Sequence, residues 1–160
     1  MEDRVMKTTV KVVIAVIVTL LISAVGMFFL ALYLESPVAI PYTDEKYNFA
    51  ENLSVEVDDN GDVYLTRKNE AAGTICNYGF ARYSGTKYEG FTLLEAKKVL
   101  GEADGLGINL VTQRFNYHSQ IKLPEWHEKL FLFNTNDYPK VREVFYYDEN
   151  TGTEYPIWSR

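Results

Sequence analysis

The feature that most constrains this chain is the run from Val12 to Leu34, which holds 23 consecutive residues without a formal charge. As a helix that rises about 1.5 Å per residue, this run is roughly 35 Å long, enough to cross a bilayer core of about 30 Å. A helix in water needs a polar face, and this run offers Thr19 and Ser23, whose hydroxyls can bond to their own backbone. We therefore predict an uncleaved transmembrane helix over 12–34. A cleaved signal peptide is the alternative, but its apolar core normally spans about 7 to 15 residues, and no small-x-small site follows promptly.

The charges that flank this run predict its orientation. Arg4, Lys7 and Lys11 precede it, whereas Glu35 follows it and the next basic residue is Lys46. Because basic residues are retained on the cytoplasmic side, we expect the N-terminus to be cytoplasmic. Residues 1–11 then form a cytoplasmic stub, and the chain beyond the helix is exported.

The exported part has the size and charge of one acidic domain. It has 126 residues, enough for a single core, with 13 basic and 20 acidic residues and so a net charge of −7. This charge argues against nucleic acid and favours either simple solubility or a basic protein partner. Residues 35–50 contain Pro37 and Pro41 and no apolar periodicity, so we expect a tether there and a domain over 51–160.

Cys76 is the sole cysteine, so no disulfide can form within the chain. Its neighbours offer no base or cation, which favours a packing role over a reactive one. The sequence has two histidines, His118 and His127, too few for a metal site by themselves, and we predict no cofactor. A thiol nucleophile formed by Cys76 and one of these histidines remains the enzymatic alternative.

Alternating residues predict a β-hairpin early in the domain. Leu53, Val55 and Val57 alternate with polar residues, the letters DDNGD at 58–62 predict a turn, and the alternation resumes afterwards. The turn also matches the first half of an EF-hand calcium loop. Val63 stands where that loop needs glycine and Asn69 where it needs glutamate, so we expect a plain turn.

Capping residues predict one short helix. Thr92 is the N-cap, Glu95 completes a capping box and Gly101 is the C-cap. The letters GFTLLE at 90–95 also spell a prepilin cleavage motif, but a long apolar helix should then follow, and none does. Strands are expected over 112–118, 129–133 and 141–147, with an edge strand over 155–158. We predict an α+β fold in which the short helix packs on an antiparallel sheet, preceded by the hairpin.

The pattern Gly90-x-Thr92-x-x-Glu95-Ala96-x-x-x-Leu100-Gly101, followed by aromatic strands, resembles the SmpA/OmlA-like small envelope proteins. It is also similar to the wider β-lactamase-inhibitor-like α+β fold, and the resemblance covers roughly residues 85–148. It implies a bacterial envelope protein that binds other envelope proteins and is not an enzyme. Together with the predicted membrane anchor, it leads us to expect a bacterial inner-membrane protein with a periplasmic domain. It further implies structural, helix-capping roles for the four positions Gly90, Thr92, Glu95 and Gly101. The family's aromatic strand signature corresponds here to Phe115 and Tyr117.

The loop from Leu123 to His127 is the most suggestive binding element, because Trp126 stands there between proline and charge. Such a tryptophan is either tucked onto the core or presented as an anchor for a partner. The expected binding residues are Trp126, Pro124, His127, Tyr117 and Phe115. We therefore expect a membrane-anchored extracytoplasmic protein-binding module, either an envelope assembly accessory or an inhibitor or immunity protein. The alternative is an extracytoplasmic hydrolase or thiol enzyme.

Overall fold

The computed structural model describes residues 2–67, 74–83, 86–90, 92–114 and 129–160, with the backbone alone for 2–8, 74–78 and 86–90. The chain divides into two compact units, Met1–Ser36 and Pro37–Arg160. Each unit is described by itself below.

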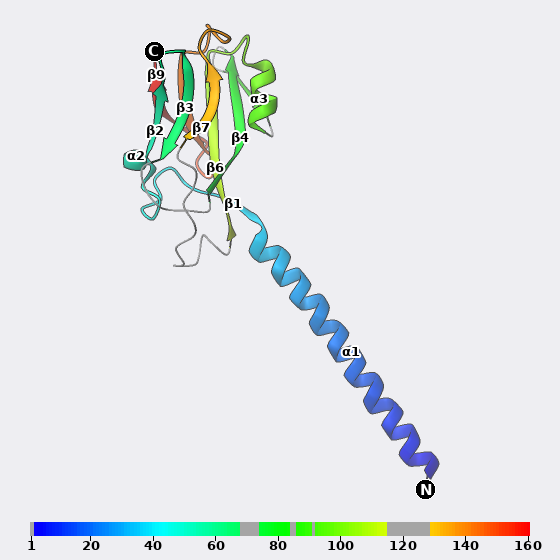
Figure 1. Ribbon diagram of the computed structural model, residues 1–160. Coiled ribbons are helices and arrows are strands. Elements are labelled where there is room, and N and C mark those ends of the chain that lie inside the picture. Colours follow the sequence, from blue (N-terminus) through cyan, green and yellow to red (C-terminus); the bar gives the residue numbers. More distant parts are fainter. Residues whose placement is uncertain (1, 68–73, 84–85, 91, 115–128) are drawn as a thin grey trace. The chain divides into compact units, whose positions relative to one another are not determined.

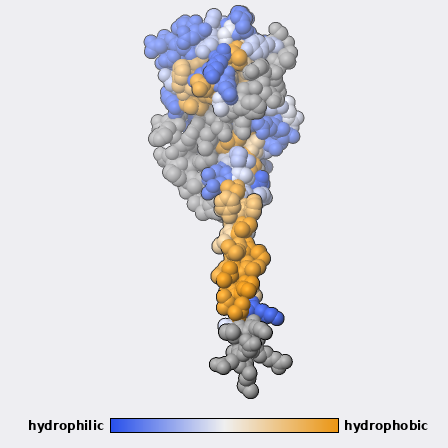
Figure 2. Space-filling model, turned by 90° about the vertical axis from the view of Figure 1, so that its right-hand side faces the viewer, coloured by the Kyte–Doolittle hydropathy of each residue, from blue (hydrophilic) through white to orange (hydrophobic). Residues whose placement is uncertain are grey.

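The first unit is a single helix, α1 (Glu2–Glu35), drawn in blue in Figure 1. Its segment Thr9–Glu35 is long and apolar enough to cross a membrane, and apolar residues cover the side of the helix seen in Figure 2. The hydroxyl of Thr19 donates to the carbonyl of Ala15 at 2.9 Å, so this polar group is satisfied inside the helix, as a lipid environment requires.

The second unit combines two short helices with nine strands among the described residues (Figure 1). The helices are α2 (Phe49–Asn52) and α3 (Leu93–Val99). The strands are β1 (Pro37–Ala39), β2 (Leu53–Val57), β3 (Asp62–Arg67), β4 (Thr74–Tyr83), β5 (Thr86–Gly90), β6 (Gly105–Gln113), β7 (Lys129–Asn134), β8 (Glu143–Asp148) and β9 (Thr153–Ser159). The fold is therefore α+β, as the sequence predicts.

The strands form two sheets. The larger has the order β5-β4-β6-β8-β9, and β1 pairs with the end of β6 beyond β8; the smaller has the order β2-β3-β7. We expected an antiparallel sheet, whereas the larger sheet contains one parallel pair of strands. Strand β7 joins β3 in the smaller sheet, and β6 and β8 then pair in parallel. Parallel neighbours need a long crossover connection, and the chain between β6 and β8, which includes β7, provides it.

Strand β6 lies earlier in the chain than the strand expected over 112–118. Glycines obscure its pattern in the sequence, and one of them is required by packing. A Cβ on Gly107 would lie 2.5 Å from the ring of Phe145 on the neighbouring strand β8. The expected strand residues 115–118 lie outside the described part of the chain.

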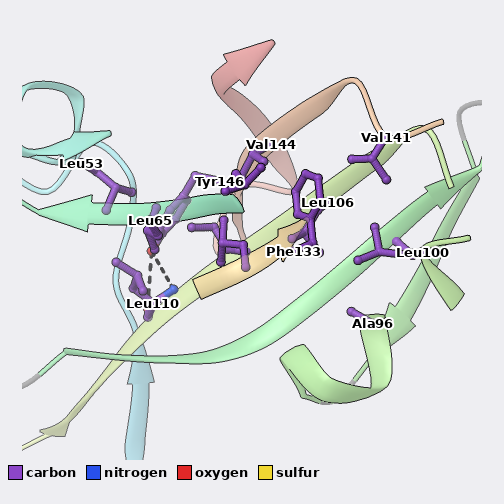
Figure 3. Close-up of a cluster of buried hydrophobic side chains, with 14 of the residues drawn as sticks. Leu53, Leu65, Ala96, Leu100, Leu106, Leu110, Phe133, Val141, Val144 and Tyr146 are labelled. Carbon is purple, nitrogen blue, oxygen red and sulfur yellow. Dashed lines mark hydrogen bonds between the residues drawn. The ribbon is translucent and has the colours of Figure 1, made fainter. Parts of the chain in front are cut away.

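The main core lies between one face of the larger sheet and a layer formed by α3 and the smaller sheet. Figure 3 shows side chains from both sheets and α3 converging on it. Helix α3 comes very close to strand β4, because a Cβ on Gly79 would lie 2.8 Å from the Cβ of Ala96. The pairing of β4 with β6 is irregular between Cys76 and Tyr78.

The segment after β1 belongs to this core, so the predicted tether over 35–50 is wrong. Ile40, Tyr47 and Phe49 are each at most 1% exposed. The hydroxyl of Tyr146 donates to the carbonyl of Ile40 at 2.5 Å and accepts from the backbone N–H of Leu110 at 3.4 Å. The segment shows no periodicity because it passes from a strand through turns into a single helical turn. The folded unit therefore begins at Pro37.

Helix α3 begins at the expected residue and ends differently. Thr92 precedes it, and its Oγ1 accepts from the backbone N–H of Glu95 at 3.1 Å and donates to the carboxylate of Glu95 at 3.0 Å. The expected C-cap at Gly101 is wrong: Leu100 keeps a right-handed conformation, and Gly101 does not have a positive φ. Backbone hydrogen bonds between residues three positions apart end the helix instead. Gly90 is the last residue of β5, where it pairs with Gly79.

Candidate binding surface

The outer face of the smaller sheet carries an aromatic pair, the half-buried Tyr64 and the exposed Phe131. Along β3, Val63 and Leu65 are fully buried, so the intervening Tyr64 points away from the core. Tyr64 lies opposite Glu56 of β2 on one side and Phe131 of β7 on the other. We call the set Glu56, Tyr64, Lys129 and Phe131 the outer sheet face.

The aromatic rings of this face meet edge to face and are bracketed by charges. The ring centroids of Tyr64 and Phe131 are 5.7 Å apart with 65° between the planes, and Phe131 is 43% exposed. The ammonium of Lys97 on α3 lies 4.6 Å from the centroid of Phe131. The ammonium of Lys129 lies 2.7 Å from the carboxylate of Glu56. This arrangement combines an apolar centre with a charged rim, as protein interfaces do.

A shallow cavity of about 460 Å³ adjoins the face beside the β2–β3 turn. Its described wall consists of Glu56, Val57, Asp58, Tyr64 and Lys129. Partial loss of hydration raises the pKa of Tyr64, and the nearby carboxylates of Asp62 and Asp58 raise it further. The Tyr64 hydroxyl is therefore a neutral hydrogen-bond donor at physiological pH.

The turn beside this cavity is held in place by hydrogen bonds. The carboxylate of Asp58 accepts from the backbone N–H groups of Asn60 and Asp62, each at 2.9 Å. The side-chain amide of Asn134, at the end of β7, donates to the carbonyl of Asn60 at 3.1 Å. Gly61 has φ +84°, the left-handed conformation that glycine adopts readily. Asp58 thus serves the turn, and the described residues hold no group of three or more metal-ligating side chains.

A second charged cluster centres on Arg82, on the other face of the larger sheet from α3. Its guanidinium bonds to Asp104 at 3.1 Å, to Glu154 at 3.0 Å and also to Glu143, and it lies 4.9 Å from the ring centroid of Phe145. Burial alone would lower the pKa of Arg82, but the hydrogen bonds to these carboxylates raise it overall. We interpret this cluster as structural, because all three carboxylates already bind the guanidinium.

The predicted binding residues Trp126, Pro124, His127, Tyr117 and Phe115 all lie outside the described residues, so their role stays a prediction. The same holds for the thiol–histidine alternative, because His118 and His127 also lie there. The backbone of Cys76 is described, and it pairs with Leu110 in the centre of the larger sheet.

Sequence reasoning missed the outer sheet face. The alternation of apolar residues on either side of Tyr64 predicts that its side chain lies on the outer face of β3. Its neighbour Phe131 lies 67 positions later, and nothing local in the sequence pairs the two residues.

Comparison of the chain with protein-family models, with curated proteins and with solved structures finds no match in any of the three.

Proposed function

We propose that this chain is a single-pass protein of the bacterial inner membrane whose extracytoplasmic domain binds another exported or envelope protein through the outer sheet face. The observation that carries the proposal is the pair of the half-buried Tyr64 and the exposed Phe131, flanked by the Lys129–Glu56 ion pair and by Lys97. Aromatic residues at the centre of a patch, with charged residues around them, are the usual anchors of protein recognition.

The orientation in this proposal rests on charge. Arg4, Lys7 and Lys11 precede the apolar segment Thr9–Glu35 or lie at its start, and no basic residue follows it before Lys46. Retention of basic residues in the cytoplasm places the domain on the opposite side of the membrane.

The character of the partner follows from the domain's net charge and from the composition of the face. A net charge of −7 beyond residue 34 steers basic proteins toward the domain and repels acidic polymers. The face itself holds one lysine and one glutamate that are already paired, so its affinity should come mainly from the aromatic rings.

The proposal is tested by capture from a detergent extract of membranes with the full-length chain as bait. We expect a specific protein to be retained by the wild type and its apparent affinity to fall at least tenfold with Phe131→Ser, because a central aromatic anchor is lost. Quantitative mass spectrometry of the retained proteins measures the loss.

The matched control is Leu94→Ser, which removes an exposed apolar side chain on α3 outside the face. Both variants should unfold at the wild-type temperature within a few degrees, since both side chains are on the surface. Binding through the outer sheet face would be contradicted if Leu94→Ser lowered the affinity for the partner as much as Phe131→Ser does. It would also be contradicted if Phe131→Ser left this affinity unchanged.

A further inference from the structure

A cavity of about 370 Å³ lies where the chain after β1 meets strand β9. Its lining includes Tyr42, Asp44, Glu45 and Asn48 of the chain after β1 and Tyr155 of β9. The rings of Tyr42 and Tyr155 are stacked, with centroids 4.3 Å apart and 17° between the planes. The volume is at the lower end of the range of about 300–1,000 Å³ for small-molecule sites, so it fits one side chain or a small amine.

Hydrogen bonds hold this wall in shape. The backbone N–H of Tyr42 donates to Asp148 at 2.9 Å, and Asp148 is buried. The carbonyl of Asp44 accepts from the backbone N–H of Asn48 at 2.8 Å, and its carboxylate accepts from the backbone N–H of Lys46 at 2.9 Å. Asn48 has φ 44°, a left-handed conformation that asparagine tolerates better than most residues. A wall held in this way is organised before a ligand binds, which lowers the entropic cost of binding.

The wall combines aromatic rings with negative charge. Asp44 and Glu45 bring two carboxylates, and none of the described lining residues is basic. Lys46 lies next in the chain but does not line the cavity, and its ammonium is 5.4 Å from the ring centroid of Tyr47. Aromatic rings beside carboxylates attract organic cations, because the electron-rich ring faces and the carboxylates both favour positive charge.

We propose that this cavity binds the ammonium group of a lysine side chain presented by a protein partner. The acidic net charge of the domain favours a basic partner. A choline headgroup of a phospholipid has similar cation chemistry, but it would bring its phosphate against Asp44 and Glu45, which disfavours it. The inference rests on the proposed function, since it names a chemical feature of the partner, and the cavity shares no described lining residue with the outer sheet face.

The test uses nuclear magnetic resonance on the isotope-labelled full-length chain in uncharged detergent micelles. The probe is Nα-acetyl-lysine methylamide, and its Nε-acetylated form is the neutral control. We expect saturable shifts at the backbone amides of Glu45, Asn48 and Tyr155 with the charged probe only. The variant Glu45→Gln should weaken this binding at least threefold, whereas Asp59→Asn, which removes one charge from the exposed β2–β3 turn, should change it less than twofold.

Three results would overturn the inference: equal shifts with the neutral probe, equal weakening by Asp59→Asn, or stronger binding of glycerophosphocholine than of the lysine probe. If the wild type and Glu45→Gln captured the same protein in equal amounts, the ammonium site would be overturned. The proposed function would then stand. Saturable lysine binding at these amides without any captured protein would overturn the proposed function and leave the ammonium site in place.

Discussion

At the scale of single residues, Gly79 explains how a helix as short as α3 packs on the larger sheet. Its missing side chain lets the helix backbone approach β4, since a Cβ there would lie 2.8 Å from the Cβ of Ala96 and 3.1 Å from the Cα of Leu93. Both contacts are shorter than ordinary van der Waals separation, and one of them is to backbone. The glycine is therefore required by packing, although its φ is ordinary.

We predict that Gly79→Ala lowers the free energy of unfolding by about 1–3 kcal/mol, because the helix must shift away from the strand. Chemical denaturation of the full-length chain in detergent, followed by near-ultraviolet circular dichroism, measures the change. The matched control is Gly101→Ala, where a new Cβ meets nothing within 4 Å. It should be neutral or stabilising by up to about 1 kcal/mol. Equal destabilisation by the two substitutions would contradict this packing account.

Single residues also mark the limit of prediction from sequence. The N-cap at Thr92 depends on residues within one helical turn, so its signal is local. The bonds of Arg82 join it to Asp104, Glu143 and Glu154, residues between 22 and 72 positions away. Such a cluster exists only once the sheet order is known, and no local pattern of charges predicts it.

At the scale of elements, strand signals were informative where one face is buried and the other exposed. Strands β2 and β3 lie where the alternation predicts strands. Strand β6 is buried along almost its whole length and contains glycines, so it lacks alternation. The pairing of β7 with β3 joins strands that are far apart in the chain, and this pairing decides both the mixed sheet and the outer sheet face.

The segment before α2 gives the strongest element-scale prediction. We expect a chain of residues 37–160 to fold cooperatively and a chain of residues 51–160 to lose cooperative unfolding. The shorter chain lacks β1 and the buried side chains of Ile40, Tyr47 and Phe49. Burial of each such side chain contributes on the order of 1.5–3 kcal/mol, so their joint loss approaches the whole stability of a small domain.

Thermal unfolding followed by circular dichroism measures this difference, and amide hydrogen exchange locates it. If a chain of residues 51–160 unfolded as sharply as the longer chain, residues 35–50 would be a tether and would not belong to the folded core. Loss of cooperativity in both chains would instead indicate that the domain requires α1.

At the scale of the whole molecule, the chain joins an apolar helix to an acidic domain that folds around its own core. The helix was predictable because few structures other than a membrane-spanning helix accommodate an uncharged run of this length. The outer sheet face was not predictable, because its strands lie far apart in the sequence and Lys97 of α3 flanks it. The cavity at Tyr42 and Tyr155 likewise brings together both ends of the domain.

The central claim is that this domain binds a protein partner through the outer sheet face, and site-specific photo-crosslinking in living cells tests it most directly. A benzophenone amino acid replaces Tyr64 in the full-length chain, and a second variant carries it at the exposed Asn150 in the β8–β9 turn as the control. We predict one discrete crosslinked protein from position 64 and none from position 150. No adduct from position 64, or the same adduct from both positions, would contradict the claim.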